Sequence, residues 1–296
     1  MPEMDGFEVL ARLKSDPARR DLPVIVISAL DEMESVVRSI GMGAEDYLPK
    51  PFDLKDLLSK VNKALLQTVT SANIACGFHA GDADTMAKTM AWAVQQNVGI
   101  GAHPGFDDLQ GFGRRRMDVP LATLANQLRY QIGAAQAMAR SVGGTVRHLK
   151  LHGALSNMAS TDADLARACY EAALEVAPDI IIMGLAGTAM ETVARDLKCA
   201  WAGEIFADRA YNADATLVDR RQPGAMIHDP DEAARRMVAM VKAGAILTEG
   251  GGKIETRIDT ICVHGDSAEA VVLARGVRAG LEEAGIEVRA FDGATL

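Results

Sequence analysis

The sequence is poor in the features that mark membrane, secreted and nucleic-acid-binding proteins. Its 296 residues contain no apolar run near the roughly 18 residues that a membrane span requires. The first residues have neither the basic region nor the apolar region of a signal peptide. The net charge of -9 lacks the basic excess typical of nucleic-acid-binding surfaces. We therefore expect a cytoplasmic protein with no nucleic-acid or membrane partner.

Cysteine is also scarce, and the spacing of the cysteines does not indicate a disulfide-stabilised fold. The four cysteines (Cys76, Cys169, Cys199 and Cys262) are far apart, and no CxxC pair occurs. We expect buried free thiols in a reducing compartment rather than disulfides. The chain has no Walker-type phosphate loop and no Pro/Gly/Ser-rich linker.

Strand-like and helix-like segments alternate over residues 68–296. We expect strands at 69–76, 98–103, 146–152, 180–185, 202–206, 260–264 and 288–291. Helices are expected at 84–96, 121–141, 162–176, 187–197, 231–243 and 267–284. This order of βα units predicts an α/β fold with a parallel sheet or barrel.

The alternation within these strands separates polar from apolar side chains. In R-H-L-K-L-H, His148, Lys150 and His152 share one face, because side chains two residues apart point the same way. The strands that end at His103 and His264 show the same form. The polar faces are expected to point into a barrel and converge at its carboxyl end, where barrel active sites lie.

Two further features of the predicted interior concern charge. Lys150 lies in mid-strand between two leucines, so we expect it to be buried with an acidic partner such as Glu204 or Asp208. The run Arg114–Arg116 follows G-F-G after the strand that ends at His103. It is either a solvated face or an anion-binding group near the same site.

Residues 1–67 carry three motifs in order: M-P-E-M-D-G, V-I-V-I-S-A and G-A-E-D-Y-L-P-K-P-F. They resemble the second half of a response-regulator receiver domain. The resemblance implies that Ser28 matches the switch hydroxyl and Lys50 the phosphate-contacting lysine. The family's phosphoacceptor aspartate and its magnesium-binding acidic pair have no counterpart in the sequence. We therefore expect 1–67 to be a structural remnant, a partial receiver-like segment.

Six motifs over residues 66–296 carry a second resemblance. They are S-A-N-I-A-C-G-F-H-A-G-D, G-A-H-P-G-F-D-D-L-Q-G-F-G-R-R, K-L-H-G-A-L-S-N, F-A-D-R-A-Y, R-Q-P-G-A-M-I-H-D-P and C-V-H-G-D. This stretch resembles the LamB/YcsF family, whose members form the A component of bacterial 5-oxoprolinase. The resemblance implies a (β/α) barrel of the deacetylase-like type over 68–296. It also implies ATP-dependent opening of 5-oxoproline to glutamate, with ATP used through partner subunits B and C.

One departure from the family concerns its first strand. The acidic stretch D-L-N-A-D-L-G-E, which the family carries ahead of residues 64–71, is absent, and the half flavodoxin-like receiver fragment stands in its place. Both source folds use parallel βα units. We therefore expect the strand 44–50 to dock in the vacated slot of the barrel, with Lys50 near its mouth.

The chemistry of lactam opening suggests roles for the polar strand ends. A base must activate water, a cation must hold phosphate, and a donor must protonate the leaving nitrogen. The candidate base and proton-shuttle residues are His79, His103 and His152. The candidate orienting carboxylates are Asp82, Asp208 and Asp266. The candidate substrate- and anion-binding residues are Asn73, Arg114, Lys150, Arg209 and His264.

Two alternatives stay open at this point. His79, His103 and His152 with an aspartate could hold a divalent metal for amide hydrolysis without ATP. The chain could instead be a natural or engineered chimera without catalytic activity, because the receiver phosphoacceptor and the first acidic strand are both missing.

Overall fold

The computed structural model describes residues 5–17, 19–20, 22, 24–28, 33–50, 61, 63–265 and 270–293. Residues 5–50, here called the N-terminal segment, contain α1 (Gly6–Ser15), β1 (Ile25–Ser28), α2 (Met33–Gly41) and β2 (Asp46–Pro49). β1 and β2 form a parallel two-stranded sheet in which Ile25 pairs with Asp46. These βα units agree with the half receiver fold expected from the sequence.

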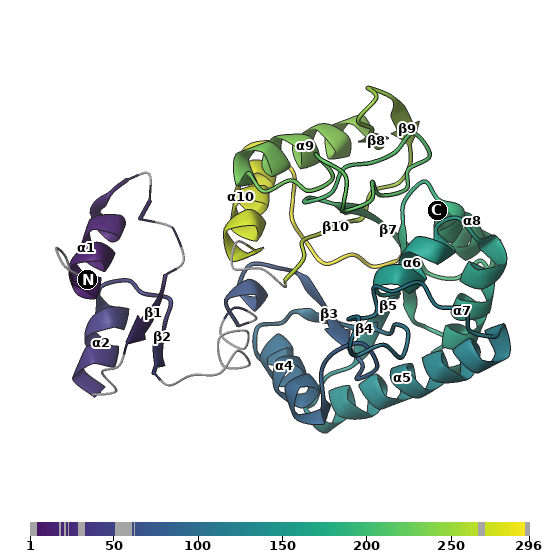
Figure 1. Ribbon diagram of the computed structural model, residues 1–296, viewed down its shortest axis with the longest axis horizontal. Helices are drawn as coiled ribbons and strands as arrows, with labels where there is room; N and C mark the ends of the chain where they lie inside the picture. The colour runs from purple at the N-terminus through teal and green to yellow at the C-terminus, as the bar shows by residue number, and fades with distance from the viewer. Residues whose placement is uncertain are drawn as a thin grey trace.

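The remainder of the chain is built on one curled, parallel, six-stranded sheet (Figure 1). Its strands are β3 (Ser71–Ala75), β4 (Gly99–His103), β5 (Val146–Lys150), β6 (Ile181–Leu185), β7 (Trp201–Phe206) and β10 (Thr260–Cys262). Their order in the sheet is β10-β7-β6-β5-β4-β3. All six carboxyl ends therefore open on the same side, as the βα pattern predicts.

Helices surround the outside of this sheet (Figure 1). They are α4 (Ala83–Gln95), α5 (Leu121–Ser141), α7 (Ala163–Val176), α8 (Ala189–Asp196), α9 (Pro230–Ala243) and α10 (Ala270–Glu283). The short helix α6 (Gly153–Ala159) instead follows the carboxyl end of β5. Local chemistry fixes their ends. Asp162 caps α7 by accepting from the Leu165 amide, and Gly244 ends α9 in the left-handed conformation with φ 57°.

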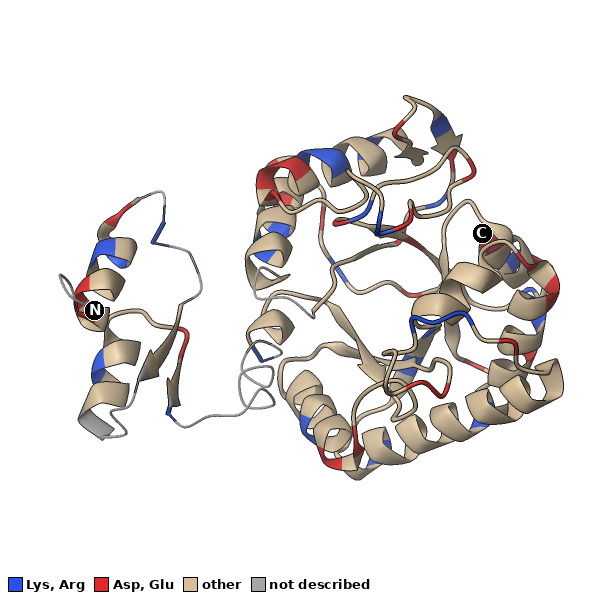
Figure 2. Cartoon of the chain, viewed as in Figure 1, with Lys and Arg blue, Asp and Glu red and all other residues tan. Residues whose placement is uncertain are grey.

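The hydrophobic core lies between the outer face of the sheet and these helices. Alternate strand residues such as Ile100, Leu149, Ile182 and Ile205 are almost fully buried there. Acidic and basic positions are interspersed along the outer helices and loops (Figure 2). Within the described residues, no helix is long and apolar enough to cross a membrane.

Three details differ from the sequence-based expectation. Residues 288–291 have no regular secondary structure and join no sheet, although Val288 packs against the core. The short helix α6 and the antiparallel hairpin of β8 (Ala245–Leu247) and β9 (Lys253–Glu255) were not predicted. Both are too short for hydrophobic periodicity to reveal them.

The expected docking of the strand 44–50 into the barrel is wrong. β2 pairs with β1, and β3 and β10 stand at the two ends of the six-stranded sheet. The side chains of Tyr47 and Leu48 are already buried. The N-terminal segment reaches the barrel differently, because Glu45 accepts two hydrogen bonds of 2.9 and 3.0 Å from Arg275 on α10.

Candidate functional site

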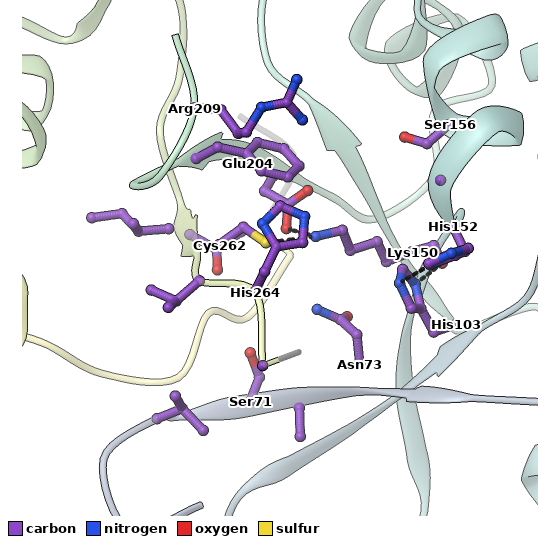
Figure 3. A pocket seen from close by; sticks show the side chains of 18 of the residues that line it. Ser71, Asn73, His103, Lys150, His152, Ser156, Glu204, Arg209, Cys262 and His264 are labelled. Atoms are coloured by element: carbon purple, nitrogen blue, oxygen red, sulfur yellow. Dashed lines mark hydrogen bonds and ion pairs between the residues drawn. The ribbon is translucent and has the colours of Figure 1, made fainter. Parts of the chain in front are cut away.

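A cavity of about 1770 Å³ lies at the carboxyl ends of the six strands and extends between β3 and β10. Figure 3 shows side chains from β3, β5, β7 and β10 around it. The candidate residues that line it are Asn73, His79, Asp82, His103, Arg114, Lys150, His152, Arg209 and His264. One cavity thus brings together most of the side chains that the sequence singled out.

The remaining candidates are not among the described residues that line the cavity. Asp208 is buried directly behind His264. Asp266 lies outside the described residues. Ser28 ends β1 and Lys50 follows β2, so both belong to the N-terminal segment.

Lys150 forms a buried ion pair across the interior. Its Nζ lies 2.5 Å from Glu204 Oε1 and 3.0 Å from Cys262 Sγ, and 4.7 Å from the centre of the Phe206 ring. Burial lowers the pKa of Lys150, but Cys262 and Glu204 outweigh burial and raise this pKa above its usual value. Of the two partners that the sequence allowed, the structure places Glu204 on the lysine.

His103 and His152 are linked edge to edge, and we call them the histidine pair. His103 Nε2 lies 3.0 Å from His152 Nδ1. At the two ends, His103 Nδ1 lies 2.7 Å from the carbonyl oxygen of Lys150, and His152 Nε2 lies 2.8 Å from that of Phe112. His79 stacks on His152 with ring centroids 3.7 Å apart and an interplanar angle of 4°.

Burial dominates the electrostatics of these rings. It lowers the pKa of His79 to about 3 and of His152 to about 4, and it lowers the pKa of His103 well below its usual value. The positive charges of Arg114 and Lys150 act in the same direction, on His152 in both cases. The carbonyl of Phe112 opposes them by favouring the protonated ring of His152.

Glycines in the 104–113 loop allow this close packing. A Cβ on Gly113 (φ 62°) would lie 2.7 Å from His79 Cβ and 2.9 Å from His152 Cδ2. The 104–113 loop is also tied to the strand end, because the His152 amide donates to the Pro104 carbonyl at 2.9 Å. Buried Gln131 holds both the amide and the carbonyl of Gly105. The sequence G-F-G before the arginines therefore serves ring packing.

The arginine run divides between two functions. Arg115 forms a close ion pair with Asp108. Arg114 and Arg116 line the cavity, and the Arg114 guanidinium lies 4.9 Å from the centre of the Phe112 ring. The run is thus partly structural and partly exposed to the site.

Asp208, His264 and Arg220 form a chain on the opposite wall. His264 Nδ1 lies 2.6 Å from Asp208 Oδ2, and Arg220 Nη2 lies 3.0 Å from His264 Nε2. Because arginine only donates, Nε2 accepts and the ring proton sits on Nδ1, toward Asp208. Arg209 beside this chain is buried, and its Nε has no partner among the described residues.

Two candidates have structural partners. Asp82 caps α4 by accepting from the Thr85 amide at 2.8 Å. Asn73 Oδ1 lies 2.9 Å from His148 Nε2, and burial lowers the pKa of His148 to about 3. His148 is on the predicted inner face but does not line the cavity.

Two participants were missed by sequence reasoning. Strand alternation put Cys262 on one face with His264, but we expected only a buried free thiol there and not a partner of Lys150. The Phe112 carbonyl could not be found, because a backbone acceptor carries no sequence signal. Within the described residues, no three His, Cys, Asp or Glu side chains are arranged to hold a metal ion.

Comparisons with known proteins agree with this architecture. The response regulator receiver domain matches residues 1–62. The 5-oxoprolinase A subunit from Ruegeria pomeroyi is 66% identical over 229 residues, which is 77% of this chain and 90% of that protein. The protein of the same name from Gluconobacter oxydans is 50% identical over 78% of this chain and 91% of its own.

A solved structure gives the same result. The crystal structure of a lactam utilization protein from Thermus thermophilus superposes with a TM-score of 0.72 and 40% identity, covering 78% of this chain and 92% of that one. Residues 55–295 match the LamB/YcsF family. The chain therefore belongs to the LamB/YcsF family.

Proposed function

We propose that the chain acts as the A component of a 5-oxoprolinase, which opens 5-oxoproline to glutamate with ATP and partner subunits B and C. One observation carries the proposal. The Lys150–Glu204 pair, the histidine pair and the Asp208–His264 pair converge on a single cavity at the strand ends. Relatives that are 66% and 50% identical to this chain carry the name of that component.

The reaction explains why such a site is needed. A five-membered lactam is a stable amide, so transfer of the ATP γ-phosphoryl group to its oxygen makes the ring carbon electrophilic. Water then attacks that carbon, the ring C–N bond breaks and the nitrogen takes a proton, which leaves an acyl phosphate. A second water cleaves this acyl phosphate to the free carboxylate and phosphate. The net change converts 5-oxoproline, ATP and two waters to glutamate, ADP and phosphate. In this proposal subunits B and C supply the phosphoryl transfer.

The cavity residues suit the hydrolytic half of this sequence. Lys150 and Arg209 supply positive charge for the phosphoryl oxygens. The histidine pair, with His79 stacked on it, moves protons between water and the leaving nitrogen. Asp208 orients His264 from behind.

Reconstitution tests the proposal. The purified chain is mixed with subunits B and C of a related system, and glutamate release from 5-oxoproline is measured with ATP, beside a full-length family member. Release near the control's rate supports the proposal. No release beside a working control contradicts it. Release that needs no ATP and disappears with a chelator would instead support metal-assisted amide hydrolysis.

One observation favours a second candidate, a folded chain without activity. β3 and β10 end the sheet, and the cavity extends between them. The slot left by the missing first strand is thus not filled by β2. The same assay separates the two candidates, because an inactive chain would still leave the control working.

A further inference from the structure

The hydrogen bonds of the histidine pair fix its number of protons. Each end of the pair faces a backbone carbonyl, at Lys150 for His103 and at Phe112 for His152. A carbonyl oxygen only accepts, so both outer ring nitrogens must carry a proton. The inner contact between the rings, 3.0 Å long, needs one more proton between its two nitrogens. Two neutral imidazoles hold two protons in total, and this arrangement requires three.

Every neutral arrangement leaves at least one contact without a proton. If both rings donate outward to the carbonyls, the two inner nitrogens face each other with bare lone pairs at 3.0 Å. If His152 donates to His103 from Nδ1, its Nε2 is bare and points a lone pair at the Phe112 carbonyl from 2.8 Å. If His103 donates instead, its Nδ1 is bare and faces the Lys150 carbonyl at 2.7 Å. A buried polar contact without its proton is destabilising.

The surroundings of the pair oppose this extra proton. The titratable and charged groups that act on it are His79, Arg114, Lys150 and His264, and each lowers the pKa of one or both rings. The nearby carboxylates are engaged elsewhere, since Glu204 pairs with Lys150 and Asp208 with His264. The geometry thus requires a positive charge that these carboxylates do not balance.

We infer that the cavity binds an oxyanion together with one proton, which the histidine pair takes up and shares between its two rings. The anion supplies the negative charge that balances the pair. This inference goes beyond the proposed function and does not depend on it, since it concerns binding to this chain alone.

Donors for the anion line the same cavity as the histidine pair. Arg209 is only 4% exposed, and its Nε has no partner among the described residues. Lys150 has three ammonium protons, of which Glu204 and Cys262 engage two. Figure 3 shows Arg209, Lys150 and the histidine pair around the same space. Stacking of the neutral His79 ring on the protonated His152 ring also stabilises the charged pair, because the face of a neutral aromatic ring attracts a cation.

Two kinds of oxyanion could occupy the cavity, a tetrahedral phosphoryl group or a carboxylate. Sulfate is the probe for the first, because it stays a dianion throughout the pH range used. 5-Oxoproline is the probe for the second, because its only charge is a carboxylate. Isothermal titration of each into the full chain, in buffers of different ionisation enthalpy, counts the protons exchanged on binding.

We expect uptake of about one proton per anion near pH 7, because binding raises the pKa of the pair above that of the anion-free protein. Between these two pKa values, the dissociation constant for the anion should increase about tenfold for each unit by which the pH rises. Uptake with sulfate alone assigns a phosphoryl site, and uptake with 5-oxoproline alone assigns a carboxylate site. Binding without proton uptake, binding with proton release, or no binding of either probe overturns the inference.

Matched variants locate the proton. In His103→Asn and His152→Gln, the new amide can keep the donation to the backbone carbonyl, but the titrating ring is gone. Proton uptake should fall close to zero in both, while His228→Asn, which changes an exposed histidine, keeps it. If a variant is unfolded by circular dichroism, nitrogen-15 spectra of the wild-type rings decide instead. They must show three ring protons on the pair with anion bound, and two would overturn the inference. Neither measurement needs subunits B and C, so its failure is distinct from failure of the proposed function.

Discussion

Lys150 Nζ and Glu204 Oε1 lie 2.5 Å apart, on strands β5 and β7 with β6 between them. Both side chains are over nine-tenths buried. The pair thus crosses the concave face of the sheet and fixes the position of the Lys150 ammonium in the cavity. A buried ion pair does not by itself stabilise a protein, but removing one partner leaves a charge without compensation.

Glu204→Gln should therefore destabilise the fold by about 3–5 kcal/mol, because the Lys150 ammonium loses its counter-charge. Lys150→Met alone should also destabilise, since it leaves the carboxylate unpaired. The double variant should lose less than the sum of the two. Urea unfolding of the four proteins gives the coupling energy. Strict additivity would show that the two groups do not interact in solution.

The pH dependence of stability should report buried His148. Burial lowers its pKa to about 3, below the value near 6.5 of an unfolded chain. The unfolded state therefore binds more protons as the pH falls below 6.5, and stability is lost until the pH reaches the folded pKa. Between pH 7 and pH 5 this group alone should cost about 2 kcal/mol.

His148→Gln tests this sign, because a glutamine amide can still donate to Asn73 Oδ1. The variant should show a pH 7 to pH 5 loss that is smaller by about 2 kcal/mol, measured by urea unfolding. His228→Gln, at an exposed position, should leave the slope unchanged. An identical slope in His148→Gln would mean that His148 is not held neutral in the folded state.

Gly113 and Gly143 offer a matched pair of substitutions. Both have positive φ, 62° and 78°, so alanine strains the backbone at either. A Cβ on Gly113 would meet His79 and His152, whereas a Cβ on Gly143 meets nothing within 4 Å. Both variants should therefore lose about 1 kcal/mol of stability from the backbone alone.

Only Gly113→Ala should also disturb the stacked rings. Its glutamate release in the reconstituted assay should fall by about tenfold or more, since displacement of positioned groups is costly to catalysis. Gly143→Ala should keep a rate within about twofold. Equal rates in the two variants would show that the stack of His79 on His152 is not needed.

Strand alternation was enough to predict the inner face of the barrel. It placed Lys150 inside with an acidic partner, because a charge between two leucines in mid-strand requires one. It also placed Cys262 and His264 on one face. Such rules are local, and they hold because the side-chain period of a strand is fixed at two.

The link between His103 and His152 was not predictable in this way. It depends on the path of the 104–113 loop, which brings the Phe112 carbonyl to His152. The predicted position of β2 in the barrel was wrong for a related reason. The sequence of β2 specifies a parallel strand but not the sheet that it joins, and β2 pairs with the nearby β1. Contacts set by loop geometry and by competition between sheets lie beyond pattern reasoning.

Asp208→Asn should slow the proposed reaction without unfolding the protein. The Asp208 carboxylate accepts from His264 Nδ1 and so keeps the lone pair on Nε2. An asparagine amide can turn its donor toward Nδ1, which moves the ring proton to Nε2, facing the Arg220 donor. Because positioned acid–base groups contribute about 100-fold or more, kcat for glutamate release should fall by about that factor, with KM changed less. Asp196→Asn, which removes an exposed partner of Arg167, is the control and should keep the wild-type kcat. A wild-type kcat for Asp208→Asn as well would remove His264 from the reaction and leave the histidine pair and Lys150 to carry it.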